Sequence, residues 1–92
     1  MYKVTNYTKQ QAKKLNVKIT PSEKKNKKLD VFTTSGKYIT SVGDNRYKDY
    51  PTYINEKGQK YADDRRKLYK ARHEKDRKVR NSAGYYADKL LW

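Results

Sequence analysis

The sequence has no cysteine, and it holds only one histidine and ten acidic residues among its 92 positions. Without cysteine, neither disulfide bonds nor thiolate metal sites can form, which fits a reducing compartment. The ten Asp and Glu residues face 24 Lys and Arg residues, so the net charge is +14. A positive field of this size attracts polyanions, and nucleic acid is therefore the first class of partner that the composition indicates.

Long hydrophobic runs are also missing. The longest have two or three residues, as at Tyr85-Tyr86-Ala87 and Leu90-Leu91-Trp92. Such runs are too short for a membrane span or for the core of a signal peptide. We therefore expect no membrane partner and a protein that is not secreted.

The apolar content that is present is small. Hydrophobic residues make up 34% of the chain, and ten residues of that share are tyrosines. The length is that of one small domain, which we take to span residues 1–92. A small domain with so few apolar side chains is often supported by oligomerisation, so we expect a homodimer.

Charge is distributed unevenly along the chain. Residues 1–28 carry nine lysines and one glutamate, residues 29–50 balance at zero, and residues 51–92 carry twelve bases and six acids. High charge with low hydrophobicity is typical of disorder, but aromatic residues spread through the chain favour a folded domain. The neutral middle is the best candidate for its packed centre.

The first elements that the sequence predicts are a short helix and a short strand. Thr8 suits the N-cap of a helix that runs to Leu15, with Gln11 at the capping-box position. Residues 17–20 then alternate apolar and polar side chains, which predicts a strand that Pro21 ends.

A β-hairpin is the clearest local signal. The β-branched and aromatic runs 29–33 and 37–42 flank a three-residue connection that contains Gly36, where a positive φ is needed. This pairing predicts two cross-strand contacts, Phe32 with Tyr38 and Val31 with Ile39.

The second half of the chain predicts one long helix from Pro51 to about Val79, because proline suits the first helical position. Gly58 costs about 1 kcal/mol there relative to alanine, so either the helix is interrupted or another segment packs closely against it. After a break at 81–84, the aromatic segment 85–92 is expected to dock on the core. The predicted fold class is α+β: a short N-terminal helix and a small antiparallel hairpin or sheet against one long basic helix.

The basic stretch 65–80 is the most informative feature for function, with nine bases and two acids. Its side chains could follow a phosphate backbone, or they could form a solvated helix face with pairs such as Asp63 to Lys67. The net charge of the whole chain favours polyanion binding. No motif for reading bases accompanies the charge, so binding would be largely independent of sequence. The candidate contact residues of this stretch are Arg65, Arg66, Lys67, Lys70, Arg77, Lys78 and Arg80, of which Arg66, Lys67, Lys70, Arg77 and Lys78 would share one helix face.

Lysines in the first third of the chain have the same two interpretations, phosphate contact or solubility. The candidates are Lys13, Lys14, Lys24, Lys25, Lys27 and Lys28. Tyrosines that stand among the bases could stack on exposed bases of single strands, or they could line the rim of the core. They are Tyr7, Tyr47, Tyr50, Tyr53 and Tyr69.

Catalysis finds little support in the sequence. His73 is the only histidine and lies inside the basic run, where a surface role is more common than that of a general base. The acid pairs Asp63-Asp64 and Glu74/Asp76 suit ion pairs on a helix better than a metal site. We therefore predict a protein that is not an enzyme and that has no metal and no cofactor.

Several segments also carry a family resemblance. They include Tyr47-Lys48-Asp49-Tyr50-Pro51-Thr52-Tyr53, Gly58-Gln59-Lys60-Tyr61-Ala62-Asp63-Asp64-Arg65-Arg66 and Gly84-Tyr85-Tyr86-Ala87-Asp88-Lys89-Leu90-Leu91-Trp92. With the segments 7–12, 17–22, 28–32 and 69–76, the chain resembles an uncharacterised family of short, Lys- and Tyr-rich proteins encoded by nucleocytoplasmic large DNA viruses of protists. The resemblance implies a viral protein that handles or packages viral DNA, located in the virion or in the cytoplasm or viral factory of the infected cell. It implies no catalytic residues.

Two functions stay open on these grounds. The first is sequence-independent DNA binding through charge neutralisation, with bridging of two DNA segments if the protein is a dimer. The second is a structural or scaffold role in the virion, in which the chain binds an acidic viral or host protein.

Overall fold

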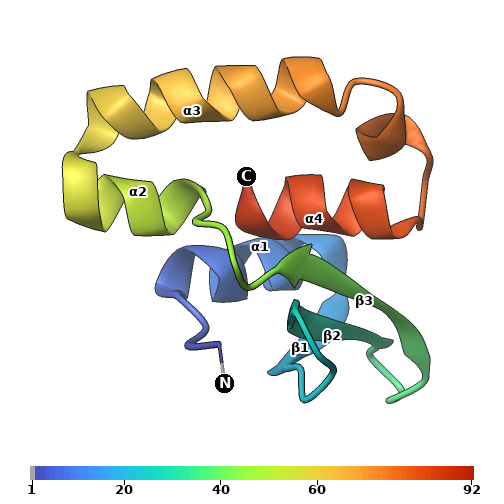
Figure 1. Ribbon diagram of the computed structural model, residues 1–92. Helices are drawn as coiled ribbons and strands as arrows, with labels where there is room; N and C mark the ends of the chain where they lie inside the picture. The colour runs from blue at the N-terminus through green and yellow to red at the C-terminus, as the bar shows by residue number, and fades with distance from the viewer. Residues whose placement is uncertain (1) are drawn as a thin grey trace.

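The computed structural model describes residues 2–92, within which four α-helices and a three-stranded sheet form an α+β fold. In Figure 1, α3 lies uppermost, α2 and α4 lie beneath it, and α1 and the sheet lie below α4. None of the helices in this part of the chain is long and apolar enough to cross a membrane. The elements are α1 (Asn6–Leu15), β1 (Val17–Pro21), β2 (Lys27–Thr33), β3 (Tyr38–Asp44), α2 (Tyr50–Lys57), α3 (Gln59–Arg72), the 3-10 helix η1 (Asp76–Lys78) and α4 (Ala83–Leu91).

Helix α1 begins earlier than its sequence predicts. Thr5, and not Thr8, is the N-cap, and its hydroxyl accepts a hydrogen bond from the backbone N–H of Thr8. Thr8 lies inside the helix, fully buried, where its hydroxyl donates to the carbonyl of Leu90 in α4 at 2.9 Å. The prediction of Thr8 as the N-cap is therefore wrong, because its burial against α4 places it inside the helix.

The sheet has the order β1-β2-β3 with antiparallel neighbours, and it contains the predicted hairpin. Phe32 pairs with Tyr38 as expected, with ring centroids 5.8 Å apart. The prediction that Val31 faces Ile39 is wrong, because a register shift between Val31 and Phe32 leaves Ile39 as an extra residue and Val31 opposite Thr40. A β-bulge of this kind is common in antiparallel pairs and leaves no clear signal in composition.

The predicted long helix is divided into α2 and α3. Gly58 has a φ of +91° between them, and a Cβ added there would meet no atom within 4 Å. The glycine is therefore used for its backbone conformation and not for close packing. In Figure 1, α3 folds back over α2, and the chain leaves α3 after Arg72, so residues up to Val79 do not continue the helix.

The hydrophobic core joins α1, the sheet and α4. The neutral middle of the chain supplies part of it, and the C-terminal segment docks on it as predicted, in the form of helix α4 with Ser82 as its N-cap. The buried apolar residues of this core are Ala12, Leu29, Val31, Val42, Tyr86, Leu90 and Leu91. Helices α2 and α3 contribute none of them.

Candidate nucleic-acid interface

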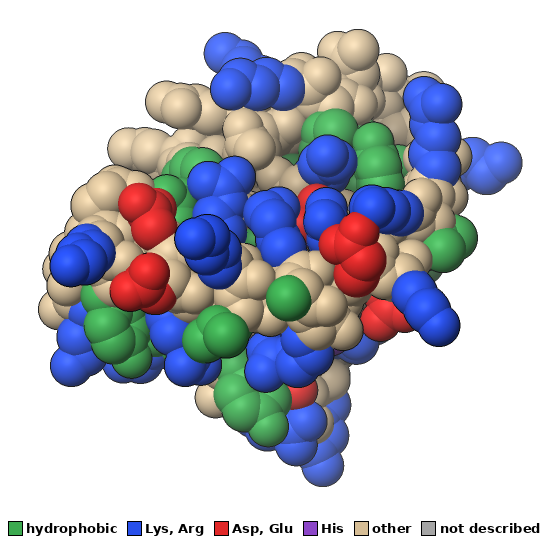
Figure 2. Space-filling model, turned by 90° about the horizontal axis from the view of Figure 1, so that it is seen from above, with side chains coloured by type: hydrophobic (Ala, Val, Ile, Leu, Met, Phe, Trp, Pro, Cys, Tyr) green, Lys and Arg blue, Asp and Glu red, His purple; other side chains and the backbone are tan. Residues whose placement is uncertain are grey.

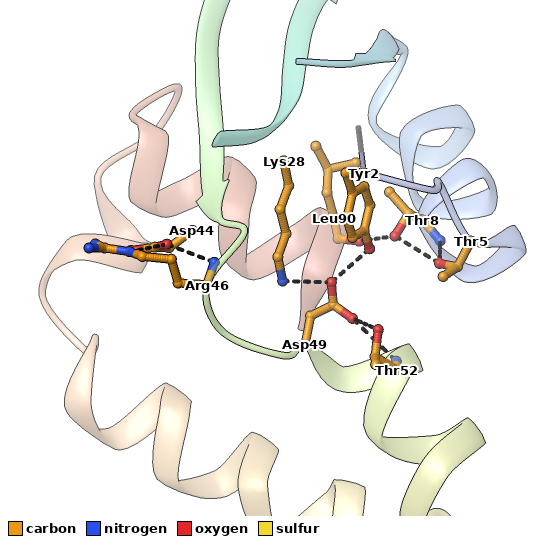
Figure 3. A network of polar contacts seen from close by, with 9 residues as sticks. All are labelled: Tyr2, Thr5, Thr8, Lys28, Asp44, Arg46, Asp49, Thr52 and Leu90. Atoms are coloured by element: carbon orange, nitrogen blue, oxygen red, sulfur yellow. Dashed lines mark hydrogen bonds and ion pairs between the residues drawn. The ribbon is translucent and has the colours of Figure 1, made fainter. Parts of the chain in front are cut away.

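Asp49, just before α2, is the most deeply buried acid of the chain. Its carboxylate accepts hydrogen bonds from Lys28 at 3.0 Å, from the Tyr2 hydroxyl at 2.7 Å and from the Thr52 hydroxyl at 2.6 Å. Figure 3 shows these donors converging on it. Burial alone would raise the pKa of Asp49, but the charge of Lys28 and the donated hydrogen bonds outweigh it and lower the pKa.

This arrangement removes Lys28 from the predicted contact set. The side chains of Lys28 and Asp49 are 5% and 0% exposed, so the ammonium group cannot reach an external phosphate. Lys28 instead joins β2 to the start of α2. Burying a lysine is costly unless a carboxylate compensates it, and the compensation here comes from a residue 21 positions away.

Lys70 has a comparable structural role between α3 and α4. Its ammonium group lies 2.6 Å from the Oδ1 atom of Asp88, which is 1% exposed, while Lys70 itself is 28% exposed. The pair therefore fastens α3 to the core helix α4. Its charge is largely neutralised in place, so Lys70 is a weak candidate for phosphate contact.

Most of the remaining acids are also engaged within the chain. Asp44 pairs with Arg46, Glu56 with Lys48, and Glu74 with both Arg77 and Lys78. Asp30 accepts a hydrogen bond from Ser41, Asp63 accepts from Tyr50 and Gln59, and Asp76 lies 3.4 Å from His73. In residues 2–92, only Glu23 and Asp64 have side chains without such a partner.

Cations are left largely without partners. Six of the 24 Lys and Arg side chains pair with an acid, which leaves 24 − 6 = 18 in the described chain that do not. Figure 2, which looks down on α3, shows Lys and Arg side chains spread over that face, with several Asp and Glu side chains among them. The surface that the molecule presents is therefore strongly cationic.

The predicted single face of Arg66, Lys67, Lys70, Arg77 and Lys78 does not form. Helix α3 ends at Arg72, so Arg77 and Lys78 lie in η1, and both pair with Glu74. The Arg77 Nε also donates to the carbonyl of Lys70 at 3.3 Å. Arg80 is exposed beyond η1 and has no acid partner in residues 2–92.

Three predicted residues on α3 remain well placed. Lys67 is exposed, and Arg65 and Arg66 are half-buried. The guanidinium of Arg66 lies 4.7 Å from the ring centroid of Tyr50, and that of Arg65 lies 5.5 Å from that of Tyr53. The rings hold both guanidinium groups on the helix without neutralising them.

The N-terminal lysines do not join this group. Lys13 and Lys14 are exposed in the last turn of α1, and Figure 1 places α1 on the other side of α4 from α3. Lys24 donates to the Tyr38 hydroxyl at 2.6 Å, and Lys25 and Lys27 are exposed near the start of β2. These lysines add to the overall field, and only Lys27 among them lines the groove between α3 and α4.

A groove of about 860 Å³ lies between α3, α4, the end of β3 and the β3–α2 connection. Its lining contains Arg65 together with two cations absent from the sequence-based set, Lys48 and Arg72. For Arg72, the sequence did carry a signal. It lies seven residues after Arg65 and three after Tyr69, and residues at these spacings share a helix face. The lining also includes Lys27, Tyr47, Tyr53, Tyr69, His73 and Trp92.

The rings in this groove contact one another. Tyr69 and Trp92 are stacked, with centroids 4.3 Å apart and planes 6° from parallel. His73 lies 4.5 Å from Tyr69 on the α3 side, and Tyr53 lies 6.2 Å from Trp92. Burial raises the pKa of the Tyr69 hydroxyl to about 12, so this ring stays neutral over the physiological range.

Within residues 2–92, no three His, Asp or Glu side chains gather in a way that could hold a metal ion. The neighbouring acids Asp63 and Asp64 have different surroundings. Asp63 accepts hydrogen bonds from Tyr50 and Gln59, while Asp64 is exposed without a partner in the described chain.

Comparisons with protein-family models, with curated proteins and with solved structures found no match to this chain. The viral resemblance therefore stays a prediction.

Proposed function

We propose that the protein binds nucleic acid without catalysing a reaction, largely independently of sequence, by contacting phosphates. The observation that supports this most directly is the division of charge. Eight of the ten acids are engaged within the chain, while 18 cations in residues 2–92 have no acid partner. A polyanion that binds such a surface releases its condensed counterions, which drives association.

The phosphate contacts are assigned to α3. Arg65, Arg66 and Lys67 project from it, and Arg72 adds a fourth cation in its last turn. Two of the arginines are held over tyrosine rings, so less side-chain entropy is lost when they bind a phosphate. The exposed lysines of α1 and of the β1–β2 connection contribute long-range attraction.

The viral role that the resemblance implies extends this proposal to the organisation or packaging of viral DNA. Bridging two DNA segments requires a second copy of the chain. The C-terminal segment offers such a copy little aliphatic surface, because Leu90 and Leu91 are buried inside the chain. Light scattering at micromolar concentration tests the homodimer, and a monomer mass would remove the bridging mechanism.

Binding to random-sequence duplex DNA across a range of salt tests the proposed function. The variant carries Arg65→Gln, Arg66→Gln, Lys67→Gln and Arg72→Gln, and we expect weaker binding and a slope of log K against log salt that is shallower by about 3 to 4. The matched control carries four Lys→Gln changes at exposed positions around α1, namely Lys9, Lys13, Lys14 and Lys18, and it should keep most of the wild-type slope.

Two results would contradict the proposal. Weak binding of the wild type at physiological salt would favour the alternative function, a scaffold that binds an acidic protein. A variant that binds as well as the wild type would remove α3 from the interface.

A further inference from the structure

The groove between α3 and α4 has the dimensions of a ligand site. Its volume of about 860 Å³ falls within the range of about 300 to 1,000 Å³ that small-ligand pockets occupy. Figure 1 places the C-terminal end of α4 beneath α3, and Trp92, which follows α4, stacks on Tyr69 of α3. The two rings that meet there come from segments far apart in sequence.

One wall of the groove carries a tyrosine that packing does not explain. Tyr47, in the β3–α2 connection, is 69% exposed. Its closest ring interaction is with Arg46, whose guanidinium carbon lies 6.0 Å from the ring centroid. Tyr47 lines the same groove as the stacked pair of Tyr69 and Trp92. The faces of that pair largely cover each other, so the exposed ring of Tyr47 is the flat apolar surface that a ligand can reach.

The rim of the groove is cationic. Lys27, Arg65 and Arg72 line it, and none of them pairs with an acid in residues 2–92. Lys48 also lines it but is paired with Glu56. Of the two acids of the lining, Asp44 pairs with Arg46, while Asp76 is 70% exposed and lies 3.4 Å from His73. A ligand that matches an exposed aromatic ring beside unpaired cations has a planar ring joined to a negative group.

We propose that the groove binds an unpaired base of a single-stranded nucleic acid, which stacks against the aromatic wall. The flanking phosphates then contact Lys27, Arg65 and Arg72. This inference rests on the proposed nucleic-acid binding and adds a preference, because a base inside a duplex is already stacked and cannot enter the groove. Stacking on aromatic side chains tolerates any base, which agrees with binding that is independent of sequence.

Trp92 makes the proposal directly testable, because it is the only tryptophan of the chain and it lies in the groove. The probes are a short oligothymidylate and an abasic strand of the same length, which carries the same phosphates without bases. At equal salt, the oligothymidylate should change the fluorescence of Trp92 and bind about 5- to 100-fold more tightly than the abasic strand. A duplex should bind without the fluorescence change.

Two tyrosine variants locate the effect. Tyr47→Ala should weaken binding of the oligothymidylate by about 5- to 100-fold and leave binding of the abasic strand unchanged. Tyr38→Ala is the matched control, since Tyr38 is also exposed, at 46%, but lies outside the groove. It should leave the affinity for both strands unchanged.

The possible outcomes distinguish the proposed base site from the proposed nucleic-acid binding on which it rests. Equal, salt-dependent affinity for the two strands with unchanged Trp92 fluorescence would overturn the base site and leave phosphate binding intact. Failure of every strand and duplex to bind at physiological salt would overturn the proposed function itself.

Discussion

The molecule has two regions that are held together in different ways. The core unit, made of α1, the sheet and α4, is joined by buried aliphatic side chains such as Leu29 and Leu90. The helical arm, made of α2 and α3, is joined to it by rings and polar contacts, among them the stack of Tyr69 on Trp92 and the pair of Lys70 with Asp88. The aliphatic core excludes water, whereas the contacts of the arm include partly exposed side chains such as Lys70.

This difference assigns stability mainly to the core unit and ligand binding mainly to the arm. The core unit supplies most of the apolar burial, which dominates the free energy of folding. The arm buries only Ala62 from α3 and Tyr50 and Pro51 from α2, and it carries free cations and half-exposed rings that a ligand can reach. Elements with few buried apolar contacts also open locally at lower free energy, so the arm should be the less protected region.

The largest expected loss of stability comes from the core unit. Leu90→Ala should lower the free energy of unfolding by about 3 to 5 kcal/mol, because Leu90 is fully buried and the change leaves a cavity. Leu68→Ala is the same change on the arm, where the residue is 58% exposed, and it should cost less than about 0.5 kcal/mol. Urea unfolding measures both, and equal losses would contradict the division into two regions.

The next largest effect is expected at the junction between the regions. Asp49→Asn should cost about 3 kcal/mol near neutral pH, because Lys28 is then buried without its counter-charge. Asp64→Asn, at an exposed acid without a partner in residues 2–92, is the control and should change stability little.

Acid unfolding gives the same junction a pH signature. The pKa of Asp49 is lowered in the folded protein, so its stabilisation is present above the unfolded value of about 3.9 and is lost as the pH falls through the lower folded pKa. Asp44, whose pKa its hydrogen bonds to Arg46 lower to about 2, titrates in the same range. The informative quantity is therefore the difference between wild type and Asp49→Asn, which should shrink on acidification. A difference that is constant with pH would exclude this role for the charge.

A smaller effect is expected where the arm meets the core unit through rings. Tyr69→Ala should cost about 1 to 2 kcal/mol, since Tyr69 is half-buried and loses its stacking on Trp92. Hydrogen exchange should show faster opening of α3 while β2 and β3 keep their protection. Tyr47→Ala should change neither quantity, and uniform acceleration in the Tyr69 variant would mean that arm and core unfold together.

Local patterns in the sequence were sufficient for much of the fold. The hairpin turn at Gly36, the alternation in residues 17–20 and the apolar end of the chain each predict an element that the structure contains. The bulge beside Phe32 and the choice of Thr5 over Thr8 as a cap depend on tertiary contacts, which a single sequence does not display. At Gly58 the sequence left two alternatives, and only the backbone conformation decides between them.

The candidate site was harder to predict, because charge counts do not show which acid neutralises which base. Lys28 and Lys70 looked like free cations, yet their partners Asp49 and Asp88 lie 21 and 18 positions away. The groove depends on the meeting of Trp92 with Tyr69, a contact between the two regions that no local pattern specifies. Helical periodicity does place Arg65, Tyr69 and Arg72 on one helix face, and these three residues are the part of the site that the sequence alone can predict.

The smallest expected effect on stability is also the sharpest test of what the arm does. Lys67 is exposed on α3 and has no acid partner in residues 2–92, so Lys67→Gln should change the free energy of unfolding by less than about 0.5 kcal/mol. If Lys67 contacts a phosphate, the same change should make the slope of log K against log salt shallower by about 0.9 in DNA binding. Lys14→Gln removes an equal charge from α1, on the far side of α4, and should leave the slope unchanged. Equal slopes for the two variants would show that only the total charge matters, and the arm would then have no contact role that distinguishes it from the rest of the surface.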